Sequence, residues 1–250
     1  MKVAVAGAGG RMGRTLIEAV LADRELELAA ALEMPGSPAL GTEIGKTKIT
    51  SDVGMVALAD ALIDFTRPEA APEHLKHARA MVLGTTGFSE AQKKAVADAA
   101  RRIPIVMAAN FAVGVNAVYK LAESAARILG EDYDVEIIEA HHRGKVDAPS
   151  GTALKLGEVV AAALKTNDFV HGRRGETGQR PRKQIGFHAI RGGDIVGEHT
   201  VIFAGPGERV EITVRSQTRM TYALGALRAA KWLKGRAPGL YDMSDVLGLR

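Results

Sequence analysis

Two adjacent histidines and a nearby lysine give the segment EAHHRGKVDAPSGTA, residues 139–153, side chains that could transfer a proton. His141 and His142 carry imidazoles, whose ordinary pKa of about 6.5 suits a proton donor near neutral pH. Lys145 adds a cation that can bind an anion such as a carboxylate. A lysine and an imidazole close together are what a reaction on a carboxylate-bearing substrate would use.

The end of the same segment has the composition of a helix start. Ser150 follows a proline and precedes Gly151 and Thr152, and serine is a favoured N-cap residue. The backbone N–H groups of a first helical turn attract anions, so a substrate carboxylate could bind there. The alternative is a capped helix after a solvated basic loop, and without a second site elsewhere in the chain that alternative is the better one.

Metal binding and serine catalysis are the other chemistries to weigh here. Adjacent histidines rarely point at one ion, the chain has no cysteine, and no HxxxH or HExxH spacing occurs. Ser150 lacks the GxSxG context of a nucleophile. We expect neither a metal site nor a serine nucleophile.

A second candidate site follows a short apolar stretch near the N-terminus, in VAGAGGRMGR. Gly7, Gly10 and Gly13 allow a sharp turn, close approach of a pyrophosphate to the backbone, and close packing of helix on strand. Glu33 ends the next apolar stretch twenty residues after Gly13, where an acid can bind a ribose hydroxyl. In this strand–turn–helix context, the motif predicts dinucleotide binding rather than a merely structural turn.

Three later apolar stretches also end in small or hydroxylated residues, in DFTRP (64–68), GTTG (84–87) and AANF (108–111). Each one alone is typical of an ordinary turn. Ligands of open α/β sheets bind at the carboxyl ends of the strands, so the three together favour a floor for a nicotinamide ring.

The elements that must position these residues change in pattern at Phe111. Before it, short aliphatic runs alternate with Ala-rich stretches, which is typical of a parallel sheet covered by helices. The predicted strands are 2–6, 26–33, 61–66, 81–86 and 103–110; the predicted helices are 11–23, 69–80 and 89–102; and loops with short strands are expected at 34–55.

After Phe111 a long amphipathic helix is predicted over 113–129, followed by strands that run nearly head to tail. A last helix over 218–234 resembles the first half in composition. We therefore predict an α/β protein with a doubly wound Rossmann-type parallel sheet domain, residues 1–112 and 220–250. The other predicted domain, residues 113–219, is an α+β substrate and oligomerisation domain with a mixed sheet.

Composition narrows the class of protein. Of the 250 residues 46% are hydrophobic and 25% charged, and no apolar run is long enough to span a bilayer. The N-terminus lacks a convincing secretory cleavage region, and the absence of cysteine fits a reducing compartment. We expect a soluble cytoplasmic protein.

The net charge of +4 is concentrated in one basic segment, HGRRGETGQRPRK at 171–183. A solvated connection is the simplest interpretation of it. Nucleic-acid binding is a weaker alternative, because no aromatic residues are interleaved for base stacking. We expect a small-molecule substrate and neither a nucleic-acid nor a membrane partner.

Taken together, these motifs resemble one family, dihydrodipicolinate reductase, also called 4-hydroxy-tetrahydrodipicolinate reductase, of bacterial lysine and diaminopimelate biosynthesis. The resemblance runs through nearly the whole chain, and EAHHRGKVDAPSGTA matches the family signature without a gap. The other matching stretches are VAGAGGRMGR, IDFTRPE, GTTGF, AANFAVGVN, TGQRPRKQIGFHAIRGGDIVGEHTVIF and RMTYALGALRAAKWL.

The resemblance implies a reductase that passes hydride from NADH or NADPH to a cyclic dicarboxylate, with loss of water. It implies that His141 donates the proton with help from Lys145, and that His142, Gly151 and Thr152 hold substrate carboxylates. It implies a homotetramer joined through the substrate-domain sheets. The residues it implies for the cofactor are Gly7, Ala8, Gly9, Gly10, Arg11, Met12, Glu33, Gly84, Thr85, Thr86, Ala108, Ala109, Asn110 and Phe111.

One departure from the family bears on the cofactor. Many relatives carry arginine directly after the ribose-binding acid, where it can accept a 2'-phosphate, whereas here Met34 follows Glu33. Glu33 still serves a free 2'-hydroxyl and repels a phosphate, so we expect NADH to be used at least as well as NADPH. Lys46, Lys48, Arg11 or Arg14 could restore phosphate binding.

A second hypothesis is a dinucleotide-binding sensor or scaffold that has the same fold without catalysis. Damage to HHRGK or SGTA would favour it, and both are intact. The sequence therefore favours the enzyme.

Overall fold

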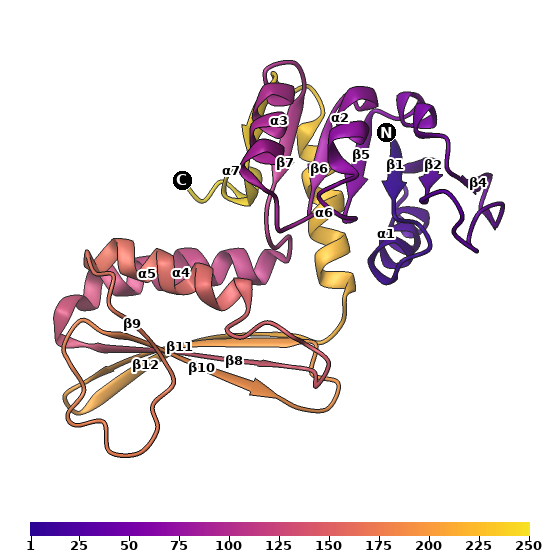
Figure 1. The fold of residues 1–250 in the computed structure, drawn as a ribbon. Helices are drawn as coiled ribbons and strands as arrows, with labels where there is room; N and C mark the ends of the chain where they lie inside the picture. The colour runs from indigo at the N-terminus through magenta and orange to yellow at the C-terminus, as the bar shows by residue number, and fades with distance from the viewer. The chain divides into compact units, whose positions relative to one another are not determined.

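The computed structural model describes residues 1–250, which form two compact units, each with a sheet of its own (Figure 1). The first unit contains Met1–Val113 and Arg219–Arg250, and the second contains Gly114–Thr218. None of the helices has the length and apolar character needed to cross a membrane.

The first unit is built on an eight-stranded sheet in the order β13-β7-β6-β5-β1-β2-β4-β3. All neighbouring strands are parallel except β3 and β4. The strands are β1 (Lys2–Ala6), β2 (Glu27–Leu32), β3 (Glu43–Ile44), β4 (Thr47–Thr50), β5 (Ala61–Asp64), β6 (Met81–Leu83), β7 (Pro104–Met107) and β13 (Gly239–Tyr241).

Helices cover both faces of this sheet, which explains why its strands are nearly all apolar. In β1, Val3 and Val5 belong to one core cluster and Ala4 and Ala6 to the other. The first cluster contains residues of α1 (Arg11–Ala22), α6 (Met220–Leu233) and α7 (Met243–Leu247), and the second residues of α2 (Ala71–His77), α3 (Glu90–Ala100) and the 3₁₀ helix η1 (Val53–Leu58). The doubly wound prediction is thereby confirmed.

The last helix, α6, returns to the first unit, as its composition suggested. Its Gly225 lies directly against the chain at Phe111: a Cβ at Gly225 would be 1.8 Å from the Phe111 carbonyl oxygen. Only glycine allows this contact, so α6 can reach the sheet beside β5, β6 and β7. The short strand β13, which pairs with β7, was not predicted, because three residues beside a Gly-Arg-Ala-Pro turn carry no strand pattern.

The second unit contains a five-stranded mixed sheet in the order β12-β11-β8-β10-β9. Strands β8, β10 and β9 are mutually parallel, while β11 is antiparallel to β8 and β12, so the predicted mixed sheet is confirmed. The strands are β8 (Asp134–His141), β9 (Phe169–His171), β10 (Ile185–Arg191), β11 (Gly197–Gly205) and β12 (Glu208–Ser216).

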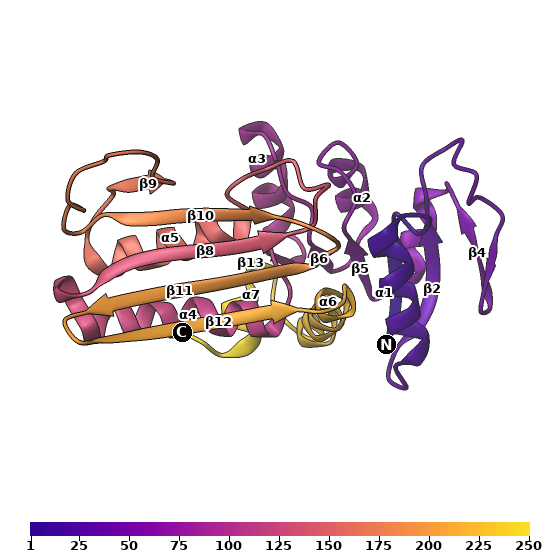
Figure 2. The same cartoon turned by 90° about the horizontal axis from the view of Figure 1, so that it is seen from below.

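Two helices, α4 (Val113–Leu129) and α5 (Gly151–Leu164), pack on one face of this sheet and enclose its core; the 3₁₀ helix η2 (Gly130–Asp132) follows α4. Figure 2 shows the opposite face, which no helix of the second unit covers. Side chains alternate along a strand, so Glu139 and His141 of β8 lie on the helix side and Glu136 and Ile138 on the open side.

Candidate active site

The glycine turn between β1 and α1 has the geometry that its sequence predicts. Gly7 has φ +73, a left-handed conformation that favours glycine, and its carbonyl accepts the Gly10 N–H at 2.9 Å. A Cβ at Gly13 would be 2.0 Å from the same carbonyl oxygen, so α1 packs against the turn only because residue 13 is glycine. Gly10 is the N-cap of α1 and provides no side-chain cap, so the first-turn amides are not covered by a capping side chain.

Glu33 follows β2 and folds back on this turn. One carboxylate oxygen accepts the Gly9 N–H at 2.8 Å, and the other accepts the Met34 N–H at 2.9 Å. A Cβ at Gly9 would lie 2.9 Å from the Glu33 carboxylate, so the pair requires glycine there. The turn, the helix start and this acid fit the pyrophosphate and adenosine ribose of a dinucleotide. The neighbouring Met34 side chain is 69% exposed.

The three strand ends singled out from the sequence meet at one edge of the sheet, because β5, β6 and β7 are parallel neighbours. Gly84, after β6, lies under the Phe65 ring. A Cβ at Gly84 would be 2.4 Å from the nearest carbon of that ring. The Phe65 and Phe111 ring centroids are 5.3 Å apart. The backbone N–H of Ala108, just after β7, donates to the carbonyl of Leu83, the last residue of β6, at 3.2 Å. This hydrogen bond joins the ends of the two neighbouring strands.

Sequence reasoning missed the buried acid that ties two of these ends together. Asp64, fully buried at the end of β5, accepts hydrogen bonds from the Thr66 N–H at 2.8 Å and the Thr66 hydroxyl at 2.6 Å. It also accepts from His74 Nδ1 at 2.7 Å and from the Thr85 hydroxyl at 3.4 Å. His74, to which the sequence gave no role, therefore supports the strand ends. The signal was an aspartate at the end of an otherwise apolar strand.

In the second unit, His141 is the last residue of β8, and one nitrogen of its ring contacts a carboxylate of the same strand. Nδ1 lies 2.6 Å from the Glu139 carboxylate, and the side chain is 12% exposed. Burial lowers the pKa of His141 below its ordinary value of 6.5; the hydrogen bond and charge of Glu139 oppose this effect without cancelling it. The charges of Lys145 and Arg191 add to the lowering.

The helix start after this strand is built as expected. Ser150 is the N-cap of α5, and its hydroxyl oxygen accepts the Ala153 N–H at 3.2 Å. Burial, followed by the nearby charge of His141, lowers the pKa of His199 to about 4, so His199 is neutral at pH 7. Its Nε2 lies 2.9 Å from the Ser150 hydroxyl, within hydrogen-bond distance. His199, 3% exposed, thus has a structural role beside the helix start.

The remaining candidate residues lie on the connection between β8 and α5. Lys145 forms an ion pair with Asp147 at 2.8 Å, and its N–H donates to the His142 carbonyl at 3.1 Å. Gly151 and Thr152 are the first residues of α5. The second unit thus holds an imidazole, an ammonium group and a helix start on one connected segment, which suits the protonation of a carboxylate-bearing molecule.

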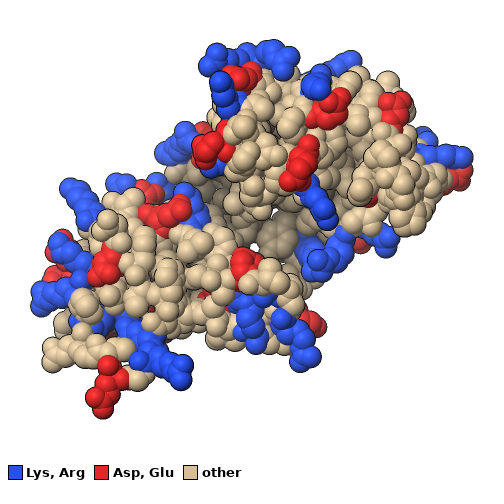
Figure 3. Space-filling view, viewed as in Figure 1, with Lys and Arg blue, Asp and Glu red and all other residues tan.

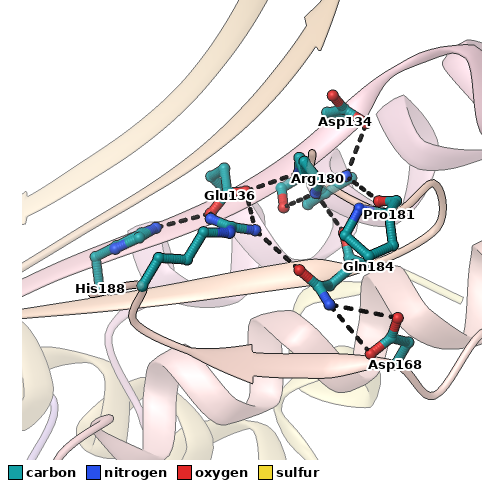
Figure 4. Close-up of polar contacts among 9 residues, drawn as sticks. Asp134, Glu136, Asp168, Arg180, Pro181, Gln184 and His188 are labelled. Atoms are coloured by element: carbon teal, nitrogen blue, oxygen red, sulfur yellow. Dashed lines mark hydrogen bonds and ion pairs between the residues drawn. The ribbon is translucent and has the colours of Figure 1, made fainter. Parts of the chain in front are cut away.

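The basic segment 171–183 is partly neutralised within the chain. Figure 4 shows Arg180 beside Glu136, with its Nε 2.9 Å from the carboxylate. Arg173 binds the same carboxylate, with Nη1 at 3.0 Å. His188 Nε2 lies 2.7 Å from it. Over the face in Figure 3, Lys and Arg are interspersed with Asp and Glu. These pairs explain two of the cations without any nucleic acid.

The Glu136 cluster leads to a pH-dependent stability. Burial by itself raises the pKa of Glu136, but hydrogen bonds from Arg173, His188 and Arg180 outweigh it and lower the pKa from 4.5 to about 2. The folded-state pKa lies below the unfolded one, so the stabilisation is complete above about pH 4.5 and is lost as the pH falls towards 2. Relative to Glu136→Gln, we expect the native chain to lose about 2 kcal/mol of unfolding free energy between pH 6 and pH 2.5.

Urea unfolding followed by circular dichroism at a series of pH values measures this difference. The matched control is Glu198→Gln, which removes an exposed carboxylate paired with Arg215 at 3.0 Å on the same side of the sheet. Solvent screens that pair. The difference in unfolding free energy between Glu198→Gln and the native chain should therefore change by less than about 0.5 kcal/mol over the same pH range. If the unfolding free energy of Glu136→Gln varied with pH in parallel with that of the native chain, the ionised Glu136 would not stabilise the fold.

Two family models and several full-length relatives match the sequence of this chain. A family model described as dihydrodipicolinate reductase, N-terminus, matches residues 1–111, and one described as dihydrodipicolinate reductase, C-terminus, matches residues 114–247. The 4-hydroxy-tetrahydrodipicolinate reductase of Aromatoleum aromaticum is 57% identical, covering 100% of this chain and 96% of that protein. The enzyme of the same name from Cupriavidus necator is 57% identical, and the alignment covers 100% of both.

A solved structure extends the agreement to three dimensions. It is a dipicolinate-bound dihydrodipicolinate reductase from Paenisporosarcina sp. TG-14, 26% identical, with a TM-score of 0.79 over 97% of each chain. Family models cover nearly the whole sequence, and relatives of more than half identity cover all of it. The chain therefore belongs to the dihydrodipicolinate reductase family of oxidoreductases.

Proposed function

We propose that this pyridine-nucleotide-dependent reductase transfers hydride to 4-hydroxy-tetrahydrodipicolinate, a cyclic dicarboxylate, in lysine and diaminopimelate biosynthesis. The product is tetrahydrodipicolinate, and one water is lost. We assign the proton donor to His141, with Lys145 assisting. The observation that supports this assignment is the single connected segment on which an imidazole held at Nδ1, a lysine and a capped helix start follow one another.

The two carboxylates of such a substrate match the cationic and N–H groups of the second unit. We assign them to His142 and to the start of α5 at Gly151 and Thr152, beside Lys145. Bound carboxylates place negative charge near His141, which raises its pKa and opposes the effect of burial. Substrate binding would thus help to keep the donor protonated for the reaction.

The cofactor belongs to the first unit in this proposal. Gly7–Met12 would hold the pyrophosphate, Glu33 the adenosine ribose, and the strand ends at Gly84–Thr86 and Ala108–Phe111 the nicotinamide. When bound, the reduced nicotinamide supplies hydride. The protein orients it through rigid turns, and Asp64 keeps two of those turns in place.

A coupled assay tests substrate and cofactor together. The condensation product of pyruvate and aspartate semialdehyde is supplied with NADH or NADPH, and nicotinamide absorbance is followed. We expect turnover with kcat/KM for NADH at least equal to that for NADPH, because Glu33 occupies the ribose position and Met34 brings no charge to a 2'-phosphate. A tenfold preference for NADPH would contradict the cofactor assignment, and no turnover with either would contradict the function.

Restoring the missing charge should change the preference. Met34→Arg places a guanidinium on an exposed position beside Glu33, and we expect kcat/KM for NADPH to rise about tenfold while that for NADH changes less than twofold. The control is Leu58→Arg, which adds the same charge to the same unit at an exposed residue just before β5 begins, at the other edge of the sheet. An equal rise in both variants would point to a general charge effect.

The open face of the second sheet supports a homotetramer as part of the proposal. Ile190 is 51% exposed there, and the Thr200 and Thr213 hydroxyls lie 2.9 Å apart on neighbouring strands of this face, which no helix of the second unit covers. An uncovered, partly apolar sheet face is suited to packing against copies of itself. Sedimentation equilibrium measures the assembly mass directly. We place the enzyme in the cytoplasm, where its pathway would operate.

A further inference from the structure

We propose that Glu139 is a positioning residue, with Arg191 as its counter-ion, that fixes the proton of His141 on Nδ1 and leaves Nε2 as the ring nitrogen that exchanges a proton with substrate. This inference rests on the proposed role of His141 and names two further residues of the same site. Neither residue was singled out from the sequence.

The carboxylate of Glu139 lies among four hydrogen-bond donors from three elements. It is 1% exposed, and it accepts His141 Nδ1 at 2.6 Å and the Ser150 N–H at 3.2 Å. Arg191 Nη1 and Nη2 lie 2.8 and 2.6 Å from its two oxygens, a bidentate pair. One buried acid therefore holds the end of β8, the end of β10 and the start of α5 together.

The hydrogen bond decides which ring nitrogen carries the proton. An ionised carboxylate only accepts hydrogen bonds, so a 2.6 Å contact places hydrogen on Nδ1 whether the ring is neutral or charged. The exchangeable proton of a charged ring is then the one on Nε2. In water the neutral imidazole favours hydrogen on Nε2 instead, so a free His141 would present the wrong nitrogen as acceptor.

Arg191 limits how strongly Glu139 acts on the ring. Its Nη2 also donates to the Asp147 carbonyl at 2.6 Å, which keeps the guanidinium in place beside the carboxylate. Burial lowers the pKa of His141, Glu139 opposes this by its hydrogen bond and charge, and the charge of Arg191 adds to the lowering, so the guanidinium weakens the upward effect of the carboxylate. The pair therefore orients the ring without holding its proton as strongly as an isolated carboxylate would.

Charged and titratable groups face His141 from every element around it. Glu139 belongs to β8, Arg191 to β10, and His199 to β11, with its ring centroid 5.1 Å from that of His141. Lys145 and Asp147 belong to the connection before α5 and pair with each other. Besides burial, which lowers the pKa of His141 most, Glu139 raises this pKa and Lys145 and Arg191 lower it.

The test is the pH profile of kcat/KM, which reports the donor in the free enzyme. In Glu139→Gln the basic limb should move down by about one pH unit, because the group that favours the charged ring is gone. In Arg191→Met it should move up by about one unit, because Glu139 then acts without its counter-ion. In the double variant the two shifts should largely cancel. In Glu139→Gln kcat should fall roughly 10- to 100-fold through lost orientation.

A merely structural role would not give opposite shifts. The proposal would be overturned if the basic limb moved in the same direction in Glu139→Gln and Arg191→Met, or if it moved in neither variant. The matched control is Glu136→Gln, which changes a carboxylate of the same strand that is also bound by arginines and a histidine, but on the opposite face. Its basic limb should stay within about 0.2 unit of the native one.

A second measurement needs no variant of the pair and no turnover. In the native protein labelled with ¹⁵N-histidine, the imidazole shifts at high pH should show His141 as the Nδ1–H form, with its signals identified by their loss in His141→Gln. A native spectrum with hydrogen on Nε2 would overturn the proposal, even if Glu139→Gln or Arg191→Met failed to fold. An Nδ1–H ring combined with unimpaired turnover of His141→Gln would instead contradict the proposed function alone.

Discussion

Replacing His141 by glutamine should lower kcat by about 100-fold or more while the chain stays folded. The reason is the loss of a general acid, which typically contributes 10² to 10⁴ in rate. Glutamine has a similar length and can still donate to Glu139, so the buried carboxylate keeps a partner in place of the ring. Steady-state turnover in the coupled assay measures the effect, and circular dichroism confirms folding.

The control for this variant is His188→Gln. His188 lies on β10 in the same sheet, and its Nε2 contacts Glu136 at 2.7 Å on the open side, away from His141. Its turnover should stay within about twofold of the native value, because it is assigned no part in the chemistry. Near-native turnover of His141→Gln would remove His141 from the role of proton donor.

Replacing Lys145 by methionine should reduce kcat/KM for the dicarboxylate roughly 10- to 100-fold. A hydrogen bond to a charged partner is worth about 1.5 to 3 kcal/mol, and methionine preserves the apolar stem while removing the charge. The loss also leaves Asp147 without its 2.8 Å partner, which adds repulsion towards an anion. Kinetics at varied substrate and saturating cofactor measure the change.

Lys155→Met serves as the matched control, because Lys155 lies on α5 with a solvent-exposed ion pair to Glu158 at 3.1 Å. We expect it to leave kcat/KM within about twofold of native. The KM for the cofactor should be unchanged in both variants, since neither residue belongs to the first unit. If Lys145→Met also retained native kcat/KM, the ammonium group would not take part in substrate binding.

The sequence by itself determined the features that depend on residues close together in the chain. Gly7, Gly10 and Gly13 build the turn before α1 through backbone contacts within a few residues, and Ser150 caps α5 through Ala153. The alternation of apolar runs also separated the parallel first half from the mixed sheet of the second. Such features follow from local conformation and from periodicity, which a sequence shows directly.

Only the tertiary structure decided which buried charged groups meet. Glu139 and Arg191 are 52 residues apart, and they come together because β8 and β10 pair in parallel with His141 opposite Arg191. The pairing of Asp64 with Thr85 likewise depends on β5 lying beside β6. The sequence shows that a polar residue in an apolar strand will need a hydrogen-bond partner when it is buried. Which residue becomes that partner depends on the register between the strands. That register is fixed by the packing of the whole sheet against its helices.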